Sequence, residues 1–179
     1  MHEDIEEVVK TQDGASISVI GKYEVKVSGP KGELSRKFPC EISIDNGNAK
    51  IFAKGVTKNQ KKLIKSCAAH IRNMVKGVLE GYSYSLQICT VHFPMNVSIA
   101  NGQVIIKNFL GEAKERKAKV LPGVEAKIDG DFIRIFSASK EAAGQTAANI
   151  ESATRVRKRD RRVFQDGIWI IKKPDEEFL

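Results

Sequence analysis

The sequence predicts an α+β fold of two tandem, duplicated domains, each an antiparallel β-sheet with one α-helix packed on one face. Three observations support this prediction: segments of similar pattern begin at Tyr23 and at Val104, each continues into a hairpin signal, and a helical pattern follows each hairpin. With 179 residues, 41% of them hydrophobic, the chain is long enough to bury a core in each copy.

The first elements of each copy are strands of alternating polarity. The first copy reads YEVKVSGPKGELSRKF from Tyr23 and the second VIIKNFLGEAKERKAKV from Val104, and in each a Gly-Glu pair precedes basic residues. The next segments, EISIDNGNAKIFAK and VEAKIDGDFIRIFSAS, interrupt an apolar alternation with Asp-Asn-Gly or Asp-Gly. Because Gly and Asn tolerate the positive φ of tight turns, both segments predict β-hairpins.

One helix is expected after each hairpin. The first has Thr57 and Gln60 at capping-box spacing and ends at Gly81. Its apolar residues recur at helical period, so we expect a buried face made of Leu63, Ile64, Cys67, Ala68, Ile71, Met74, Val75, Val78 and Leu79. The second helix is expected at 140–153 with Ser139 as its N-cap. Its buried side would hold Ala143, Ala147, Ile150 and either Ala153 or Thr154.

A further strand is expected after each helix, SYSLQICTVHF after the first and GIWII near the C-terminus. The first of these strands would run out of the first sheet and into the second, so the boundary is expected near residues 82 to 96, with domains of residues 1–82 and 83–179. The segment VFQDGIWII predicts a short strand, an Asp166-Gly167 turn and a second strand. Its alternating apolar pattern favours core packing of Phe164 and Trp169 over stacking on nucleic-acid bases.

The charge of the chain predicts a polyanionic partner. The net charge is +8 and the pI is near 9.4, which favours nucleic acid first and an acidic membrane surface second. No apolar run reaches the roughly 18 residues of a membrane span, and the acidic start MHEDIEEVV lacks the features of a secretory signal. Three cysteines without a CxxC pair fit neither a disulfide framework nor a zinc site. We therefore expect a cytoplasmic protein without a membrane partner.

The residues that support catalysis in other proteins do not form a recognisable site here. Nucleophile-elbow, phosphate-loop, zinc-protease and dinucleotide motifs are absent from the sequence. His2 belongs to a frayed terminus, and His70 to the surface or boundary of the first helix. Cys89 and His92 would lie on opposite faces of one strand, where they could not share a metal ion. The sequence thus predicts no enzyme, no cofactor, no metal site and no small-molecule substrate.

The segment Gly29-Pro30-Lys31-Gly32 matches the GXXG pattern with which one class of RNA-binding domain clamps a single strand. In that class the loop joins two helices, whereas here it lies between two extended segments. A strand-to-strand turn with Pro at its second position is therefore the favoured interpretation, and Lys31 could still touch RNA from it.

Two segments concentrate positive charge. Residues 107–120 carry Lys107, Lys114, Arg116, Lys117 and Lys119 beside two glutamates, and fit a solvated hairpin loop as well as a phosphate contact. In residues 155–162, only Asp160 offsets six cations: Arg155, Arg157, Lys158, Arg159, Arg161 and Arg162. Cations at the C-terminal end of a helix interact favourably with the helix dipole, but six of them are more than this interaction needs. Five arginines to one lysine favour structured nucleic acid, because guanidinium groups bind phosphates bidentately and stack on bases.

Three motifs, set in the two-copy pattern, resemble a universal family of large-subunit ribosomal proteins, numbered six in bacteria and nine in eukaryotes. The motifs are GPKGELSR, KNFLGE and DRRVFQDGIWI, and the resemblance covers residues 16–173. KNFLGE and RRVFQDGIWI are similar to the archaeal and eukaryotic branch, whereas bacterial members end in a GKGIRY-like segment.

The resemblance implies two similar α+β domains that bind large-subunit rRNA near the sarcin-ricin loop, where translational GTPases dock, with neighbouring ribosomal proteins as further partners. In this family the second domain is the main RNA-binding one. By position, its basic C-terminal element corresponds to residues 155–162 together with Gln165 to Gly167, and its second-repeat loop to residues 107–119. The alternative is a protein-interaction module whose basic faces bind acidic proteins or an acidic membrane.

Overall fold

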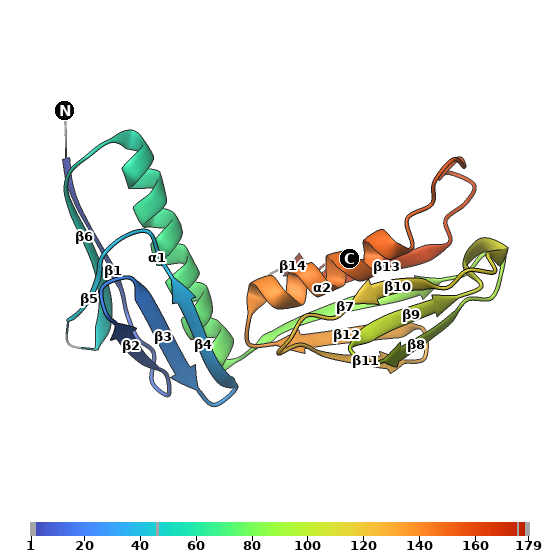
Figure 1. Cartoon of the computed structure of the whole chain (residues 1–179), viewed down its shortest axis with the longest axis horizontal. Coiled ribbons are helices and arrows are strands. Elements are labelled where there is room, and N and C mark those ends of the chain that lie inside the picture. The colour runs from blue at the N-terminus through green and yellow to red at the C-terminus, as the bar shows by residue number, and fades with distance from the viewer. Residues whose placement is uncertain (1–2, 46, 175, 178–179) are drawn as a thin grey trace. The chain divides into compact units, whose positions relative to one another are not determined.

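The chain divides into two compact units, Met1–Gly81 and Tyr82–Leu179. The structure is a computed structural model that describes residues 3–45, 47–174 and 176–177 (Figure 1), so the prediction for His2 lies outside the described residues. The first unit contains β1 (Glu3–Val9), β2 (Ser16–Ile20), β3 (Glu24–Gly29), β4 (Gly32–Lys37), β5 (Ile42–Asp45), β6 (Asn48–Val56) and α1 (Lys58–Leu79). The second contains β7 (Tyr82–Cys89), β8 (Asn96–Ala100), β9 (Gln103–Lys107), the 3-10 turn η1 (Phe109–Gly111), β10 (Arg116–Lys119), β11 (Glu125–Asp129), β12 (Phe132–Ser137), α2 (Lys140–Ala153), β13 (Gly167–Lys173) and β14 (Glu176–Glu177).

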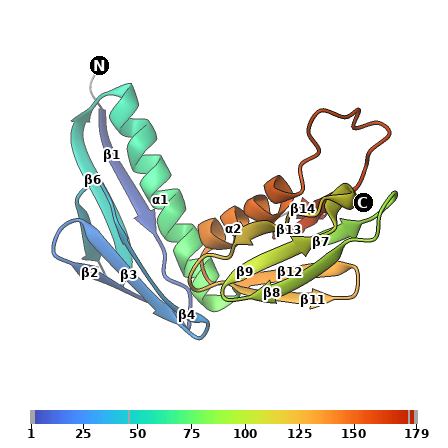
Figure 2. The same cartoon turned by 45° about the vertical axis from the view of Figure 1, so that its right-hand side comes forward.

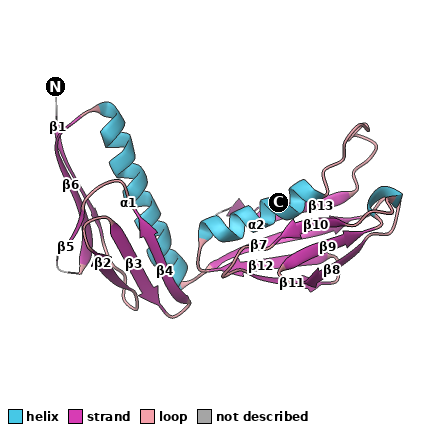
Figure 3. Cartoon of the chain, viewed as in Figure 1, coloured by secondary structure: helices cyan, strands magenta, loops and turns pink. Residues whose placement is uncertain are grey.

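Each unit combines two antiparallel sheets with one helix. The strand orders are β1-β6-β5 and β2-β3-β4 in the first unit, and β10-β9-β8 and β11-β12-β7-β13-β14 in the second. α1 packs on β1, β3, β4 and β6, and α2 packs on β7, β10, β12 and β13, so each helix covers both sheets of its own unit (Figures 1 and 3). The predicted α+β class and the duplication are thereby confirmed.

The strand after α1 belongs to the second copy. In the first unit β1 pairs with β6, the strand that precedes α1, and in the second β7 pairs with β12, the strand that precedes α2. β7 therefore takes the place in the second unit that β1 takes in the first. The prediction that this strand runs out of the first sheet was wrong, because both of its partners, β12 and β13, lie later in the chain.

Strand register confirms the two predicted hairpins. Asp45 faces Asn48 across the β5–β6 turn, and Asp129 faces Phe132 across the β11–β12 turn. Gly130 has a φ of 57°, the positive value that the Asp-Gly signal predicts for this turn.

α1 has the predicted cap and most of the predicted buried face, with Leu79 only half-buried against the core of the first unit. The Thr57 hydroxyl accepts a hydrogen bond from Gln60 N, and Gln60 Oε1 accepts one from Thr57 N at 2.8 Å, which completes a capping box. The apolar residues that α1 buries in the first core are Ile64, Cys67, Ala68, Ile71, Met74, Val75 and Val78. Leu63 is 42% exposed, so its predicted burial was wrong; it lies at the margin of the apolar stripe.

α2 also follows the prediction. Ser139 Oγ accepts a hydrogen bond from Ala142 N at 3.2 Å, and Ala143, Ala147 and Ile150 are buried against the strands. Thr154, which directly follows the last helical residue, is buried as well. Its hydroxyl accepts a hydrogen bond from Ile168 N at 2.9 Å. The end of α2 is therefore tied to β13 at the point where the arginine-rich segment begins.

The GXXG segment is the turn between β3 and β4, as predicted. Gly29 faces Gly32 across the two antiparallel strands, and Lys31 N donates a hydrogen bond to Val78 O at 2.9 Å. The turn thus rests on the last turn of α1. A Cβ added at Gly29 would lie 2.9 Å from both the carbonyl oxygen and the Cγ2 of Val78, so this contact requires glycine.

We expect Gly29→Ala to lower the free energy of unfolding by about 1–3 kcal/mol, because an extra methyl group in a close-packed contact forces the backbone to shift. Chemical denaturation followed by circular dichroism measures this change. Ser28→Ala is the control: it removes only a hydroxyl contact with Ser16, so a change below about 0.5 kcal/mol is expected. Wild-type stability of the Gly29→Ala chain would contradict the packing of this turn on α1.

Candidate nucleic-acid interface

Residues 155–166 form a single loop between α2 and β13, which we call the arginine loop. It projects beyond the end of α2 and contains neither helix nor strand (Figures 2 and 3). All of its predicted RNA-binding cations are exposed: Arg155, Arg157, Lys158, Arg159, Arg161 and Arg162. The predicted hairpin at VFQDGIWII was wrong, because β13 begins at Gly167 and pairs with β7, while the preceding residues belong to the loop.

Asp166 anchors the C-terminal end of the arginine loop. This residue is only 2% exposed, and its carboxylate accepts hydrogen bonds from Val91 N at 2.7 Å, His92 N at 2.9 Å and His92 Nδ1 at 2.6 Å. Burial raises the pKa of Asp166, but the hydrogen bonds from His92 and Val91 outweigh it and lower the pKa to about 2. The charged carboxylate therefore joins the arginine loop to the segment that follows β7.

Phe164 packs the C-terminal end of the arginine loop against the hydrophobic core of the second unit. Its ring stacks on His92, with 4.6 Å between centroids and 24° between the ring planes. Arg159 Cζ lies 4.7 Å from the centroid of the same Phe164 ring. Phe164 thus packs against the core, as predicted. His92, by contrast, does not share a strand with Cys89 as predicted, because β7 ends at Cys89.

Asp160, the one acidic residue in the basic run, shapes the backbone of the arginine loop. Its Oδ1 accepts a hydrogen bond from Arg162 N at 2.9 Å, and its carbonyl accepts one from Phe164 N at 2.9 Å. Lys158, two residues earlier, has a φ of 58° in the left-handed region. Asp160 therefore closes a turn that separates the cations before it from those after it.

Arg116 connects the β9–β10 segment to the start of the arginine loop. Its guanidinium holds both carboxylate oxygens of Glu112, at 2.6 and 2.8 Å, and lowers the pKa of that carboxyl. Its Nη1 donates to Ala153 O at 2.9 Å and to Arg155 O at 3.3 Å. Its Cζ also lies 4.2 Å from the centroid of the buried Phe109 ring. Arg116 thus joins the two predicted basic segments at the same end of the second unit. Most of its N–H groups already donate hydrogen bonds within the protein.

The four lysines of the β9–β10 segment are exposed, unlike Arg116. Lys107 Nζ lies 2.9 Å from Glu115 Oε1, and Lys114 belongs to the loop before β10. Side chains alternate along β10, so the buried Ala118 marks the side that faces α2. Lys117 and Lys119 therefore lie on the opposite, solvent-facing side of the strand.

Gln165 and Gly167 determine the position of Trp169. Gln165 O accepts a hydrogen bond from Trp169 Nε1 at 3.2 Å. Gly167 has a φ of 157°, and a Cβ added there would come within 3.3 Å of the indole ring. Trp169 is 39% exposed, so the prediction that it packs in the core was wrong. The alternation of β13 directs Ile168 into the core and Trp169 to the outer side.

The structure also shows a basic surface that the sequence prediction did not single out. α1 contains no acidic residue, and its exposed side carries Lys58, Lys62, Lys65, Arg72 and Lys76, which we call the α1 basic face. Their spacing of four, three, seven and four residues places them along one side of the helix. That spacing is the signal by which the sequence could have revealed them.

Residues 3–45, 47–174 and 176–177 do not contain the features of a metal site or of a membrane-spanning helix. In these ranges, no group of three or more His, Cys, Asp or Glu side chains could hold a metal ion. No helix among the described residues is both long and apolar enough to cross a membrane. His70 is half-buried on α1, with its Nδ1 3.3 Å from Arg36 Nη1, which agrees with the predicted boundary position.

The two-copy pattern coincides with a known protein family. The sequence profile of the family described as ribosomal protein L6 matches residues 13–81 and residues 93–167, one match in each unit. The chain belongs to the ribosomal protein L6 family. It is therefore a structural, non-enzymatic ribosomal protein, and the family predicted from the three motifs is confirmed.

Relatives in this L6 family share most of the length of the chain. "Large ribosomal subunit protein uL6" of Methanothrix thermoacetophila is 44% identical over 176 residues, which cover 94% of this chain and 99% of the relative. The protein of the same name from Archaeoglobus fulgidus is 37% identical over 176 residues, 94% of this chain and 90% of the relative. That of Methanococcus vannielii is 44% identical over 172 residues, 94% of each. These archaeal relatives agree with the predicted branch.

Both basic segments lie within the part of the second unit that matches the L6 family. The match at residues 93–167 contains the β9–β10 segment and the whole arginine loop, and it ends at Gly167. Trp169 lies two residues beyond it. The family match therefore includes the anchors Arg116 and Asp166 but not the exposed indole beside them.

Proposed function

We propose that this member of the L6 family is a structural constituent of the large ribosomal subunit and binds its rRNA through the second unit. The printed name of the relatives, at 37% to 44% identity over nearly the whole chain, supports the assignment to that subunit. The family resemblance of the sequence motifs favours an rRNA contact near the sarcin-ricin loop, beside the region where translational GTPases dock. The proposed location is thus the cytoplasmic ribosome.

The arginine loop is the observation that carries this proposal. Its cations are exposed, while its backbone is fixed by Thr154 at one end and by Phe164 and Asp166 at the other. Cations on a fixed backbone lose less conformational entropy on binding than cations on a flexible tail. A rigid arrangement of guanidinium groups suits an RNA of defined shape, because RNA helices are recognised mainly by shape and by backbone contacts.

The proposed mechanism is charge neutralisation without covalent chemistry. Each guanidinium can hold one phosphate through two parallel N–H···O bonds. Binding would displace the counterions of the RNA, so the affinity should fall steeply as salt rises. The positions of the anchored cations, rather than contacts to base edges, would select the site on the RNA.

We assign different roles to the residues of the interface. Arg116, Gln165 and Gly167 are positioning residues, because the first joins the two segments and the others hold Trp169. The proposed phosphate contacts are the exposed cations Lys107, Lys114, Lys117, Lys119, Arg155, Arg157, Lys158, Arg159, Arg161 and Arg162. Neighbouring ribosomal proteins are further proposed partners.

Sedimentation of a cell lysate at moderate salt tests the proposed function. We expect the protein to sediment with large ribosomal subunits, together with its rRNA. A protein that sediments apart from the subunits would contradict the assignment and favour a module that binds acidic proteins. Chemical probing of subunits with and without the protein then tests the location. Protection of the sarcin-ricin region is expected, and protection elsewhere alone would refute that location.

A further inference from the structure

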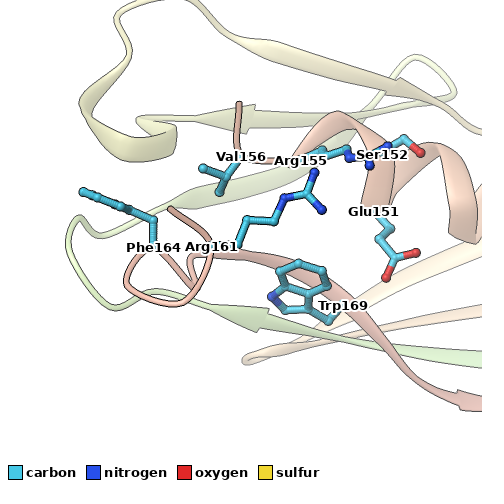
Figure 4. A pocket seen from close by; sticks show the side chains of 7 residues that line it. All are labelled: Glu151, Ser152, Arg155, Val156, Arg161, Phe164 and Trp169. Atoms are coloured by element: carbon cyan, nitrogen blue, oxygen red, sulfur yellow. The ribbon is translucent and has the colours of Figure 1, made fainter. Parts of the chain in front are cut away.

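A pocket of about 270 Å³ lies between the last turn of α2, the arginine loop and β13. Trp169, Arg155 and Arg161 line it, together with the apolar side chains of Val156 and Phe164 (Figure 4). The space therefore suits a single flat ring system with its substituents, and it is too small for a paired duplex.

The indole of Trp169 is held in place before any ligand binds. Its Nε1–H is bonded to Gln165 O at 3.2 Å, and Gly167 closely approaches the ring, since a Cβ there would lie 3.3 to 3.4 Å from three indole atoms. Trp169 is 39% exposed. Its exposed surface, which lines the pocket, therefore lies on the part of the ring that Gly167 does not cover. The exposed part of this ring is therefore open to a ligand, and the contacts with Gln165 and Gly167 set its position.

Phe164, the other aromatic ring of the pocket, is already engaged by His92 and Arg159. Trp169 is thus the ring available for stacking. The remaining polar groups suit a nucleotide: Arg155 and Arg161 supply positive charge, and Figure 4 shows the Arg161 side chain reaching between Val156 and Trp169. The carboxylate of Glu151 provides an acceptor for N–H groups on a base edge.

We propose that this pocket binds one unstacked base of the rRNA, with the base on the indole of Trp169 and the adjoining phosphates near Arg155 and Arg161. This inference rests on the proposed function and adds a ligand subsite to it. Unpaired RNA bases are commonly stacked on aromatic side chains or on guanidinium planes. Because every base has a π face, the pocket selects an exposed nucleotide by its position in the folded RNA more than by its identity.

Trp169 is the only tryptophan of the chain, so its fluorescence reports on this pocket alone. We expect titration of the full chain with an rRNA fragment that contains the sarcin-ricin region to quench this fluorescence, because a stacked base quenches indole emission. Heparin, a polyanion without bases, is the matched control and should bind without comparable quenching. Equal quenching by heparin, or rRNA binding in a filter assay without quenching, would overturn the base pocket.

Variants at Trp169 provide an independent readout. Trp169→Ala should weaken binding of the rRNA fragment by roughly 5- to 150-fold, the range found when an aromatic that stacks on a base is truncated. The log-log salt slope should remain that of wild type, because no phosphate contact is lost. Trp169→Phe keeps a ring and should restore most of the affinity, and circular dichroism verifies that both variants fold.

The outcomes separate this inference from the proposed function. Salt-dependent rRNA binding that is unaffected by Trp169→Ala would refute the base pocket and leave the rRNA-binding function in place. A loss that Trp169→Phe fails to restore would indicate a structural role for the indole and would also refute the pocket. Absence of rRNA binding by the wild-type chain would refute both proposals.

Discussion

Replacing Arg157, Arg159 and Arg162 together with alanine is expected to flatten the log-log dependence of rRNA affinity on salt by about 3, one for each lost phosphate contact. At moderate salt the affinity should fall on the order of 100-fold, if each lost arginine–phosphate contact contributes a net of about 1 kcal/mol. The variant removes the contact of Arg159 with the Phe164 ring, but the hydrogen bonds of Thr154 and Asp166 that hold the loop backbone are unchanged, so the fold should remain. Binding to a large-subunit rRNA fragment, measured at several salt concentrations, tests this prediction.

The α1 basic face provides a matched control for charge. Lys62, Lys65 and Arg72 are exposed cations of the first unit, so their replacement with alanine removes the same three charges from a different surface. If the arginine loop holds the phosphates, this control should leave the salt slope nearly unchanged. Equal flattening by both triple variants would mean that binding depends on total charge. An unchanged slope in the arginine variant would exclude those three residues from the interface.

Replacing Asp166 with alanine is expected to be the most destabilising single change at the interface, lowering the free energy of unfolding by about 2–3 kcal/mol. Hydrogen bonds to a charged group contribute roughly 1.5–3 kcal/mol, and the substitution removes an acceptor shared by three donors of Val91 and His92. Because the arginine loop loses its anchor, rRNA affinity should fall as well. Denaturant unfolding and the binding assay measure the two effects.

Asp129→Ala is the control for the loss of a carboxylate. Asp129 pairs with Arg134 at 3.1 Å, but both side chains are about two-thirds exposed, so this ion pair should contribute less than about 1 kcal/mol. A wild-type stability for Asp166→Ala would contradict the anchoring role. A loss of stability with unchanged rRNA affinity would show that the arginine loop binds without this anchor.

The effect of Asp166 should depend on pH in a defined direction. Its pKa is lowered from 3.8 to about 2 in the folded chain, so the unfolded chain takes up the proton first as the pH falls. The stabilisation by Asp166 is therefore complete well above pH 3.8 and is lost between there and about pH 2. Consequently, the stability difference between wild type and Asp166→Ala should shrink as the pH falls through that interval.

The elements of the fold were predictable wherever their signals were local. Thr57 and Gln60 lie three residues apart, and the apolar residues of each helix recur within single turns, so the caps and most of the buried faces could be located in the sequence. The Asp-Gly and Asp-Asn-Gly turns are equally local, because a positive φ is a property of one or two residues. The basic composition of residues 155–162 likewise indicated a polyanionic partner.

Contacts between distant residues were decided only by the tertiary structure. The pairing of β7 with β12 and β13, the hydrogen bonds from the Val91–His92 segment to Asp166, and the bond from Arg116 to the end of α2 all join residues far apart in the chain. The sequence around a strand or a carboxylate does not indicate which distant residue it will contact. For this reason the sequence by itself determined the two helices, the two hairpin turns, the repeat and the charge of the interface, whereas tertiary packing decided how the arginine loop is held and that Trp169 lies exposed beside it.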